Sequence, residues 1–325
     1  MKAGHETYEE LAALHNGQIE LNNPERPIIA YCPDWIYDPD SHKLCLDCPT
    51  LHHLCHEALT IAGGQLYLLS YFDTPEEILK KKSIRFDGMM IPGGRDIDPK
   101  FYYELNHGSR VDEKDSELWW NFNRKWVDHL DPKVPIFGIC YGMQVLNCLF
   151  GGKMIQDIDT IQNHRRHTKM TYKEGSFLDD ALNGVPPESS PSRKSQKNFT
   201  RFKELKEKNL IIGNCYHHQA CKNIPSCFDV VAWDNKDLIP HAIEYNKPDR
   251  KILAVQWHPE YTHSDGRGER LDPSNERLFR YFTDLCREYA RHKTHILTSA
   301  SIDQQQCHNR LQHHHDHHPK EGNEK

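Results

Sequence analysis

The sequence lacks several features that define large classes of protein. None of its apolar runs reaches the roughly 18 residues that a membrane-spanning helix needs, so we expect no membrane partner. Positive charge is not in excess, with 41 Lys and Arg against 47 Asp and Glu, and a nucleic-acid partner is therefore not expected. The first residues contain no apolar leader, and the 11 cysteines are odd in number, which argues against a secreted disulfide framework. We expect a cytoplasmic protein with reduced thiols.

Histidine and cysteine are abundant instead, with 23 and 11 copies in 325 residues, and either metal binding or catalysis could account for them. Cys45 and Cys48 form a Cys-x-x-Cys pair near Cys55 and three histidines, a combination that suggests zinc. The pair lacks the second pair of ligands that a structural zinc site needs, and residues 51–62 have the apolar spacing of a packed helix. Histidines at 313–318 would bind metal only adventitiously. We therefore expect no metal and no cofactor.

Short apolar runs alternate with helical patterns along the chain. Strands are predicted at residues 28–32, 66–69, 86–91 and 134–139, and helices at 51–62, 75–82, 117–130 and 141–150. Further strands are predicted around residues 211–212, 230–233, 242–243 and 252–257, before a final helix at 274–289. This alternation indicates an α/β fold with three layers and a mostly parallel central sheet.

No break in composition divides the chain, so one domain is expected over residues 27–291. Residues 1–26 are polar and are expected to form a loose N-terminal extension. Residues 186–209 are a polar, basic insert, interpreted as a solvated loop or as a docking surface for an acidic partner. Residues 292–325 hold eight of the histidines and are predicted to be a disordered tail.

Cys140 lies in the sharpest local motif, where an apolar strand meets Gly-x-Cys-x-Gly and then a helix. This arrangement is the thiol version of a nucleophile elbow, and its two glycines leave room for a tight turn. The turn would place the sulfur at the carboxyl end of a strand and at a helix N-terminus, where the helix dipole favours thiolate. The alternative is a small buried core cysteine.

His258 and Glu260 follow the predicted strand 252–257. Because Pro259 favours an extended conformation for His258, the two side chains are expected to project to the same side. The carboxylate could then fix the imidazole tautomer while the other ring nitrogen faces a thiol. The three residues Cys140, His258 and Glu260 would thereby form a catalytic triad. Gly93 and Gly94 also follow a strand, and their amides could stabilise an oxyanion together with that of Tyr141.

The motifs together resemble the class I glutamine amidotransferase superfamily, and more narrowly its gamma-glutamyl-gamma-aminobutyrate hydrolase branch. The resemblance rests on Pro-Gly-Gly-Arg-Asp-Ile-Asp-Pro, Gly-Ile-Cys-Tyr-Gly-Met-Gln, Gly-Gly-Lys-Met-Ile-Gln-Asp-Ile, Tyr-His-His-Gln-Ala and Gln-Trp-His-Pro-Glu, which occur in family order over residues 27–290. It implies a flavodoxin-like fold, with Cys140 as nucleophile, His258 as general base and acid, and Glu260 as the orienting carboxylate.

The resemblance also implies roles for further residues. Gly93, Gly94 and Tyr141 match the oxyanion hole. The substrate-binding matches are Gln144, His217, His218 and Gln219. Two positions depart from the branch, since Tyr141 stands where arginine is usual and Cys215 where serine is frequent. The first change leaves a backbone donor in place and puts the preference for the leaving group in doubt.

The function implied is hydrolysis of a gamma-glutamyl amide, with a small gamma-glutamyl compound as the binding partner, through a glutamyl thioester that releases glutamate. One alternative is a glutaminase subunit that passes ammonia to a partner synthase. A second is a non-catalytic interaction protein that uses its basic insert and polar tails. The sequence leaves open which gamma-glutamyl compound is cleaved and what the oligomeric state is.

Overall fold

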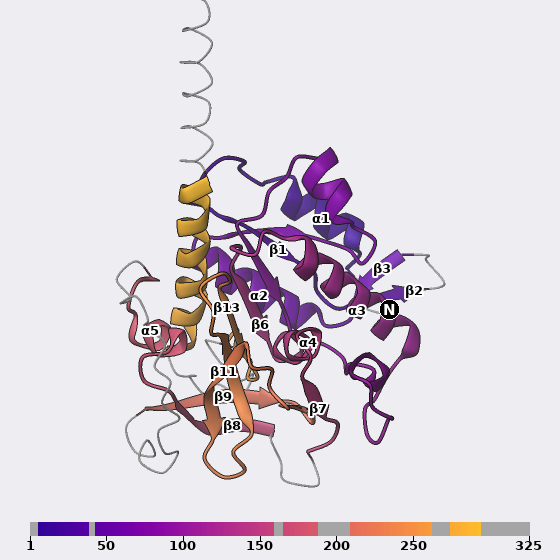
Figure 1. Ribbon diagram of the computed structural model, residues 1–325. Coiled ribbons are helices and arrows are strands. Elements are labelled where there is room, and N and C mark those ends of the chain that lie inside the picture. The colour runs from indigo at the N-terminus through magenta and orange to yellow at the C-terminus, as the bar shows by residue number, and fades with distance from the viewer. Residues whose placement is uncertain (1–5, 39–42, 159–164, 188–208, 262–273, 294–325) are drawn as a thin grey trace, which may run out of the picture.

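The protein is described here by a computed structural model that covers residues 6–38, 43–158, 165–187, 209–261 and 274–293 (Figure 1). Five parallel strands form one half of a nine-stranded sheet. In spatial order they are β4 (Gln65–Leu68), β1 (Ile28–Tyr31), β5 (Gly88–Ile91), β6 (Ile136–Ile139) and β13 (Ile252–Val255). Because these strands are parallel, their carboxyl ends meet at one edge of the sheet, where α/β proteins bind ligands.

The other half of the sheet is antiparallel. Its strands, in spatial order after β13, are β12 (Pro240–Tyr245), β11 (Phe228–Asp234), β8 (Arg165–Tyr172) and β9 (Leu210–Tyr216). Strand β9, at the end of this order, also contacts the segment that follows β13 in the parallel half. There the backbone amide of His258 donates to the carbonyl oxygen of Asn214 in β9 at 2.9 Å. Two small antiparallel sheets pair β2 (Trp35–Asp38) with β3 (Lys43–Leu46) and β7 (Lys153–Ile155) with β10 (Ala220–Lys222).

Helices cover both faces of the parallel strands, and the side chains of β6 show which helix lies on which face. The Phe137 ring contacts Phe279 and Phe282 of the helix at residues 274–293. On the opposite face, a Cβ at Gly138 would lie 2.8 Å from the backbone of Gly142 in α4. The helices are α1 (Tyr8–Asn16), α2 (Pro49–Ile61), α3 (Glu113–His129), α4 (Tyr141–Leu149), α5 (Phe177–Asn183), a π-helical turn (Glu76–Lys81), a 3₁₀ turn (Pro99–Tyr102) and the helix at 274–293.

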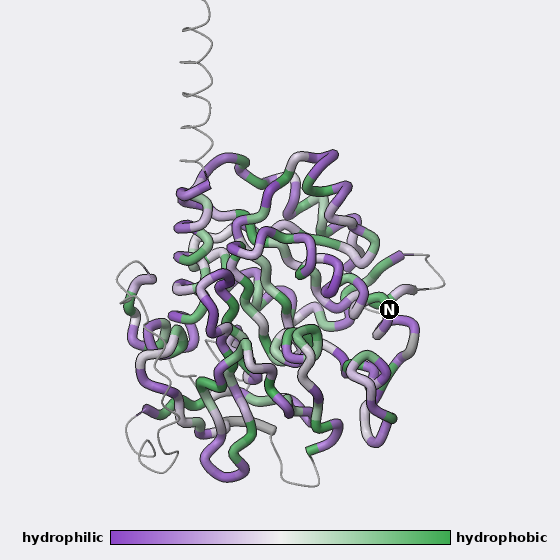
Figure 2. The backbone as a smooth tube through the Cα atoms, viewed as in Figure 1, coloured by the Kyte–Doolittle hydropathy of each residue, from purple (hydrophilic) through white to green (hydrophobic). Residues whose placement is uncertain are grey.

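This architecture confirms the expected three-layer α/β fold. The residues of the five parallel strands are all apolar or glycine, with the single exception of Gln65 in β4. All of them are buried, as a sheet covered on both faces requires. Figure 2 shows the hydrophobic stretches running through the interior of the molecule and the hydrophilic ones along its periphery. Among the described residues, no helix combines the length and the apolar character that crossing a bilayer requires.

Two of the segments interpreted from the sequence have a different structure. Residues 8–16, expected to be loose, form helix α1, which begins at a capping box between Thr7 and Glu10. The sequence did not indicate this helix because it buries only Leu11 and its apolar residues show no sustained period. At its C-terminal end, the Asn16 side chain forms hydrogen bonds with the backbone of Leu68 in β4. The segment expected as a helix at 75–82 is a short π-helical turn. Most of the basic insert and nearly all of the predicted tail, 188–208 and 294–325, lie outside the described residues.

Candidate active site

Cys140 occupies the turn between β6 and α4, with φ at 51° and ψ at −101°. A non-glycine residue adopts positive φ only at some cost, and such strain is typical of functional sites. The neighbouring backbone holds the turn, because the Cys140 amide donates to the carbonyl oxygen of Val255 at 2.7 Å. The thiol is buried at the N-terminus of α4, which agrees with the predicted elbow.

The glycine two residues after Cys140 is required by packing against β5. A Cβ at Gly142 would lie only 2.1 Å from the carbonyl oxygen of Ile91. The glycine two residues before Cys140 allows α4 to approach β6, since a Cβ at Gly138 would lie 2.8 Å from Gly142. The Gly-x-Cys-x-Gly pattern therefore reflects the close contact of one helix with two strands.

His258 and Glu260 lie beside Cys140. The Nδ1 atom of His258 is 2.5 Å from Oε1 of Glu260, and Cys140 lies near enough to the imidazole to raise the pKa of His258. Parallel pairing explains the approach, because Val255 of β13 lies opposite Ile139 of β6, so both chains reach the sheet edge at the same level. The structure thus brings all three predicted triad residues together.

The electrostatics of this group favour a charged imidazole. Burial alone would lower the pKa of His258, but the negative charges of Glu260 and Cys140, with hydrogen bonds to both, raise that pKa well above its usual value. Glu260 is almost fully buried and reaches solvent little, so its effect on the imidazole is weakly screened. The arrangement can therefore hold an imidazolium between a thiolate and a carboxylate.

Gln256 is a further side chain at the sulfur that the sequence-based reasoning did not single out. Its Nε2 donates to the Cys140 sulfur at 3.5 Å, and its Oε1 accepts from Nε2 of Gln144 at 3.3 Å. Gln144 also donates to the carbonyl oxygen of Gln219 at 3.4 Å, so its amide is held between two acceptors. The period of two along an extended chain, which aligned His258 with Glu260, also places Gln256 on their side and was the available signal.

The three residues predicted for the oxyanion hole surround the elbow. A Cβ at Gly93 would lie 2.7 Å from Cε1 of His258, and one at Gly94 would overlap the Trp119 ring at 1.7 Å. The ring of Tyr141 stacks on that of Trp119, with centroids 3.9 Å apart. Side chains at the two glycines are thus excluded by the site itself, while oxyanion binding by these amides stays a prediction.

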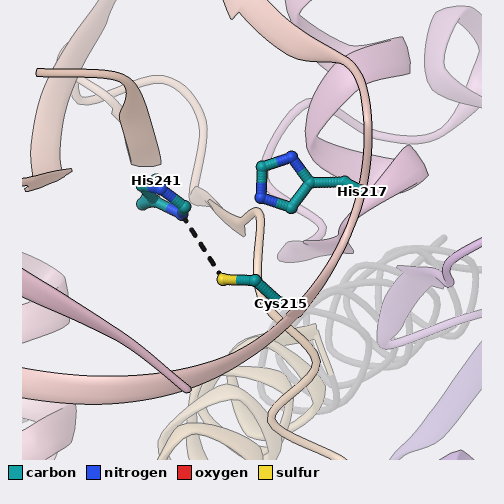
Figure 3. Close-up of side chains that lie close together, drawn as sticks. All are labelled: Cys215, His217 and His241. Carbon is teal, nitrogen blue, oxygen red and sulfur yellow. Dashed lines mark hydrogen bonds between the residues drawn. The ribbon is translucent and has the colours of Figure 1, made fainter. Parts of the chain in front are cut away.

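The segment after β9 is anchored to the loops around the elbow. Nε2 of His218 lies 2.8 Å and 3.0 Å from the two carboxylate oxygens of Asp96, a residue of the loop that follows β5. The Gln219 amide donates to Oγ of Ser109 at 2.7 Å. Nδ1 of His217 lies 2.8 Å from the carbonyl oxygen of Gln219, and the His217 ring lies beside Cys215 and His241 (Figure 3). Substrate contact by His217, His218 and Gln219 stays a prediction.

Comparisons with known proteins agree with this geometry. A glutamine amidotransferase-like protein of Rickettsia prowazekii is 29% identical over 276 residues, which cover 74% of this chain and 94% of that protein. A glutamine amidotransferase of Mycobacterium tuberculosis is 30% identical over 234 residues, covering 72% of this chain and 67% of that protein.

The solved structure of a GMP synthase subunit from Thermoplasma acidophilum is similar, with a TM-score of 0.52 over 83% of this chain and 98% of that one. At 16% identity this similarity concerns the fold alone. The sequence model of the family described as peptidase C26 matches residues 47–260, a span that contains the elbow and ends on Glu260. The chain therefore belongs to the peptidase C26 family, within the class I glutamine amidotransferase superfamily.

Proposed function

We propose that the protein is a cysteine hydrolase that cleaves gamma-glutamyl amide bonds and releases glutamate. The observation that carries this proposal is the strained elbow at Cys140, which lies beside the imidazole of His258 while Glu260 contacts Nδ1 of that ring. Family membership supports amide chemistry at this site, and the choice of gamma-glutamyl compounds rests on the motifs around it.

In the proposed reaction, the Cys140 thiolate attacks the side-chain carbonyl carbon of the gamma-glutamyl group and forms a carbon–sulfur bond. Backbone amides at Gly94 and Tyr141 stabilise the negative charge that develops on the carbonyl oxygen. The amine leaves with a proton from His258, which yields a glutamyl thioester and a neutral imidazole. His258 then removes a proton from water, whose oxygen attacks the thioester, and glutamate leaves as the thiolate is restored.

The raised pKa of His258 supports both halves of this cycle. A protonated imidazole is the form that can donate to the departing amine, and Glu260 stabilises that form. The Gln256 amide donates to the Cys140 sulfur and helps to hold that sulfur beside His258. Gln144, one helical turn beyond Cys140 in α4, is proposed to line the glutamyl pocket.

The test is to incubate the purified full chain with a panel of gamma-glutamyl amides and to measure the glutamate released. The panel covers gamma-glutamyl-aminobutyrate, other gamma-glutamyl amines, gamma-glutamyl peptides and folate polyglutamates. Cys140→Ala should abolish release, because the substitution removes the sulfur that forms the thioester. Release by Cys140→Ala at the wild-type rate would show that the mechanism is wrong.

A glutaminase subunit is the second candidate, favoured by the names of the relatives from Rickettsia and Mycobacterium. In that case the substrate is free glutamine, and the ammonia passes to a synthase. Glutamine hydrolysis that appears only when a partner is added would favour this candidate over the stand-alone hydrolase. A Cys140 that fails to react with a glutamine-analogue affinity label would instead favour a non-catalytic interaction protein.

A further inference from the structure

A second cluster of reactive side chains lies in the antiparallel half of the sheet, and no bond of the proposed reaction forms or breaks there, although the family resemblance assigns His217 to the substrate-binding residues. Cys215 lies in β9, His217 follows that strand directly, and His241 lies in β12 (Figure 3). One ligand atom from each residue can be chosen so that all three atoms lie within 4.8 Å of one another. All three side chains are buried, and those of Cys215 and His241 have no exposed surface.

The His217 ring is held by a hydrogen bond, and the His241 ring has a carboxylate near its Nε2 atom. Nδ1 of His217 is 2.8 Å from the carbonyl oxygen of Gln219, and Nε2 of His241 is 3.8 Å from Oδ2 of Asp234. Nδ1 of His241 is therefore the nitrogen that faces the thiol, at 3.9 Å from Sγ of Cys215. A histidine that ligates a metal usually donates its other N–H to a carbonyl or a carboxylate, which fixes the ring and raises its basicity.

The distance between sulfur and nitrogen fits a shared ion. Zinc binds thiolate at about 2.3 Å and imidazole nitrogen at about 2.0–2.1 Å, which places the two donor atoms about 3.5 Å apart at a tetrahedral angle and about 3.8 Å apart at a trigonal one. The 3.9 Å between Cys215 and His241 is close to this range, and the three donor atoms, which lie within 4.8 Å of one another, would move closer together around an ion.

We propose that Cys215, His217 and His241 bind one zinc ion at a buried site, with the fourth coordination position left to a water molecule. Cys215 would release its proton on binding and ligate as thiolate, with one nitrogen from each imidazole. The charges then balance, because the thiolate and the Asp234 carboxylate behind His241 offset the two positive charges of the ion. Thiolate and imidazole are the donors that zinc prefers in proteins.

This site differs from the one that Cys-x-x-Cys spacing suggested. Cys45 is buried in β3 and Cys48 is exposed at the start of α2. Within the described residues, the donor atoms that gather closely enough for one ion belong to residues from two distant strands. The proposal replaces the expectation of no metal, which considered only ligands near one another in sequence.

Cobalt(II) is a suitable probe, because it occupies zinc sites and its bond to a thiolate produces a charge-transfer band in the near ultraviolet. The full chain is produced in minimal medium with Co²⁺ as the added metal and is then treated with EDTA, which removes ions from exposed sites. The expected result is about one retained Co²⁺ per chain together with the thiolate band. A chain that retains no Co²⁺ after EDTA would overturn the proposal.

Two serine variants separate this site from the histidine-rich C-terminal segment, which contains its own thiol at Cys307. Cys215→Ser should lose the band and the retained ion, whereas Cys307→Ser should keep both. A band that survives in Cys215→Ser would also overturn the proposal. Should Cys215→Ser not fold, as judged by circular dichroism, His217→Gln takes its place and should lose the EDTA-resistant ion; retention of a full equivalent by that variant counts against the site.

Discussion

Replacing Glu260 with glutamine tests whether the buried carboxylate stabilises the charged imidazole. The substitution preserves the shape of the side chain and removes its charge from a position 2.5 Å from Nδ1 of His258. The charge centres of two such groups lie about 4 Å apart, and at an effective dielectric constant near 20 their attraction is about 4 kcal/mol. If the imidazolium is needed in the transition state, this loss corresponds to a fall of about 10³-fold in kcat.

The assay is the pH dependence of glutamate release by the wild type and by Glu260→Gln. Because Glu260 raises the pKa of His258, the decline of activity on the basic side should move to lower pH in the variant. Glu244→Gln is the matched control, since Glu244 is also buried but accepts a hydrogen bond from the Phe177 amide at 2.7 Å, away from the elbow. A Glu260→Gln variant with wild-type kcat and an unshifted basic limb would refute the reasoning.

Three other changes should have measurable effects. Gly142→Ala places a Cβ 2.1 Å from the Ile91 carbonyl, so denaturant titration should show a loss of about 1–3 kcal/mol and glutamate release should fall about 10²-fold; unchanged values would exclude the packing argument. Gln256→Leu removes the donor to the Cys140 sulfur and should slow release about 10- to 100-fold, whereas a rate within twofold of wild type would mean that this bond does not matter. Because the folded-state pKa of His258 is raised, the contribution of His258 to the free energy of unfolding is complete below about pH 6.5 and is lost as the pH rises through the folded-state pKa. Denaturant titration across this pH range should therefore show a falling free energy of unfolding, and Glu260→Gln should make this pH dependence weaker.

The elbow could be predicted from the sequence because its requirements are local. A strand, a tight turn and a helix follow one another over residues 136–149, and the glycines that permit the turn lie two residues on either side of Cys140. His258 and Glu260 could be paired for the same reason, since an extended chain aligns every second residue. That these residues reach Cys140 depends on the parallel register of β13 with β6, which only the fold decides.

The antiparallel half of the sheet was less predictable. Strand β8 was not expected, because Arg165–Tyr172 contains four basic residues and two threonines and lacks a clear apolar alternation. In strand β9 the apolar residues Leu210, Ile212 and Tyr216 are exposed while residues 213–215 are all buried, so its hydrophobicity does not indicate which face is packed. The cluster of Cys215, His217 and His241 forms only when the fold brings β9 and β12 together, and no spacing in the sequence predicts it.

The proposed zinc site and the candidate active site share backbone supports. Asn214, adjacent to Cys215, accepts the hydrogen bond from the His258 amide at 2.9 Å, and the His241 carbonyl accepts one from the Gln256 amide at 2.8 Å. Strands β9 and β12, which carry Cys215 and His241, thus bind the backbone on either side of Trp257. These hydrogen bonds fix the positions of Gln256 and His258, the two residues beside the Cys140 sulfur. An ion that joins β9 to β12 would restrict the relative movement of these strands, and tolerances of about 1 Å matter at a reacting centre. A metal that never touches the substrate would in this way act on catalysis through the positions of His258 and Gln256.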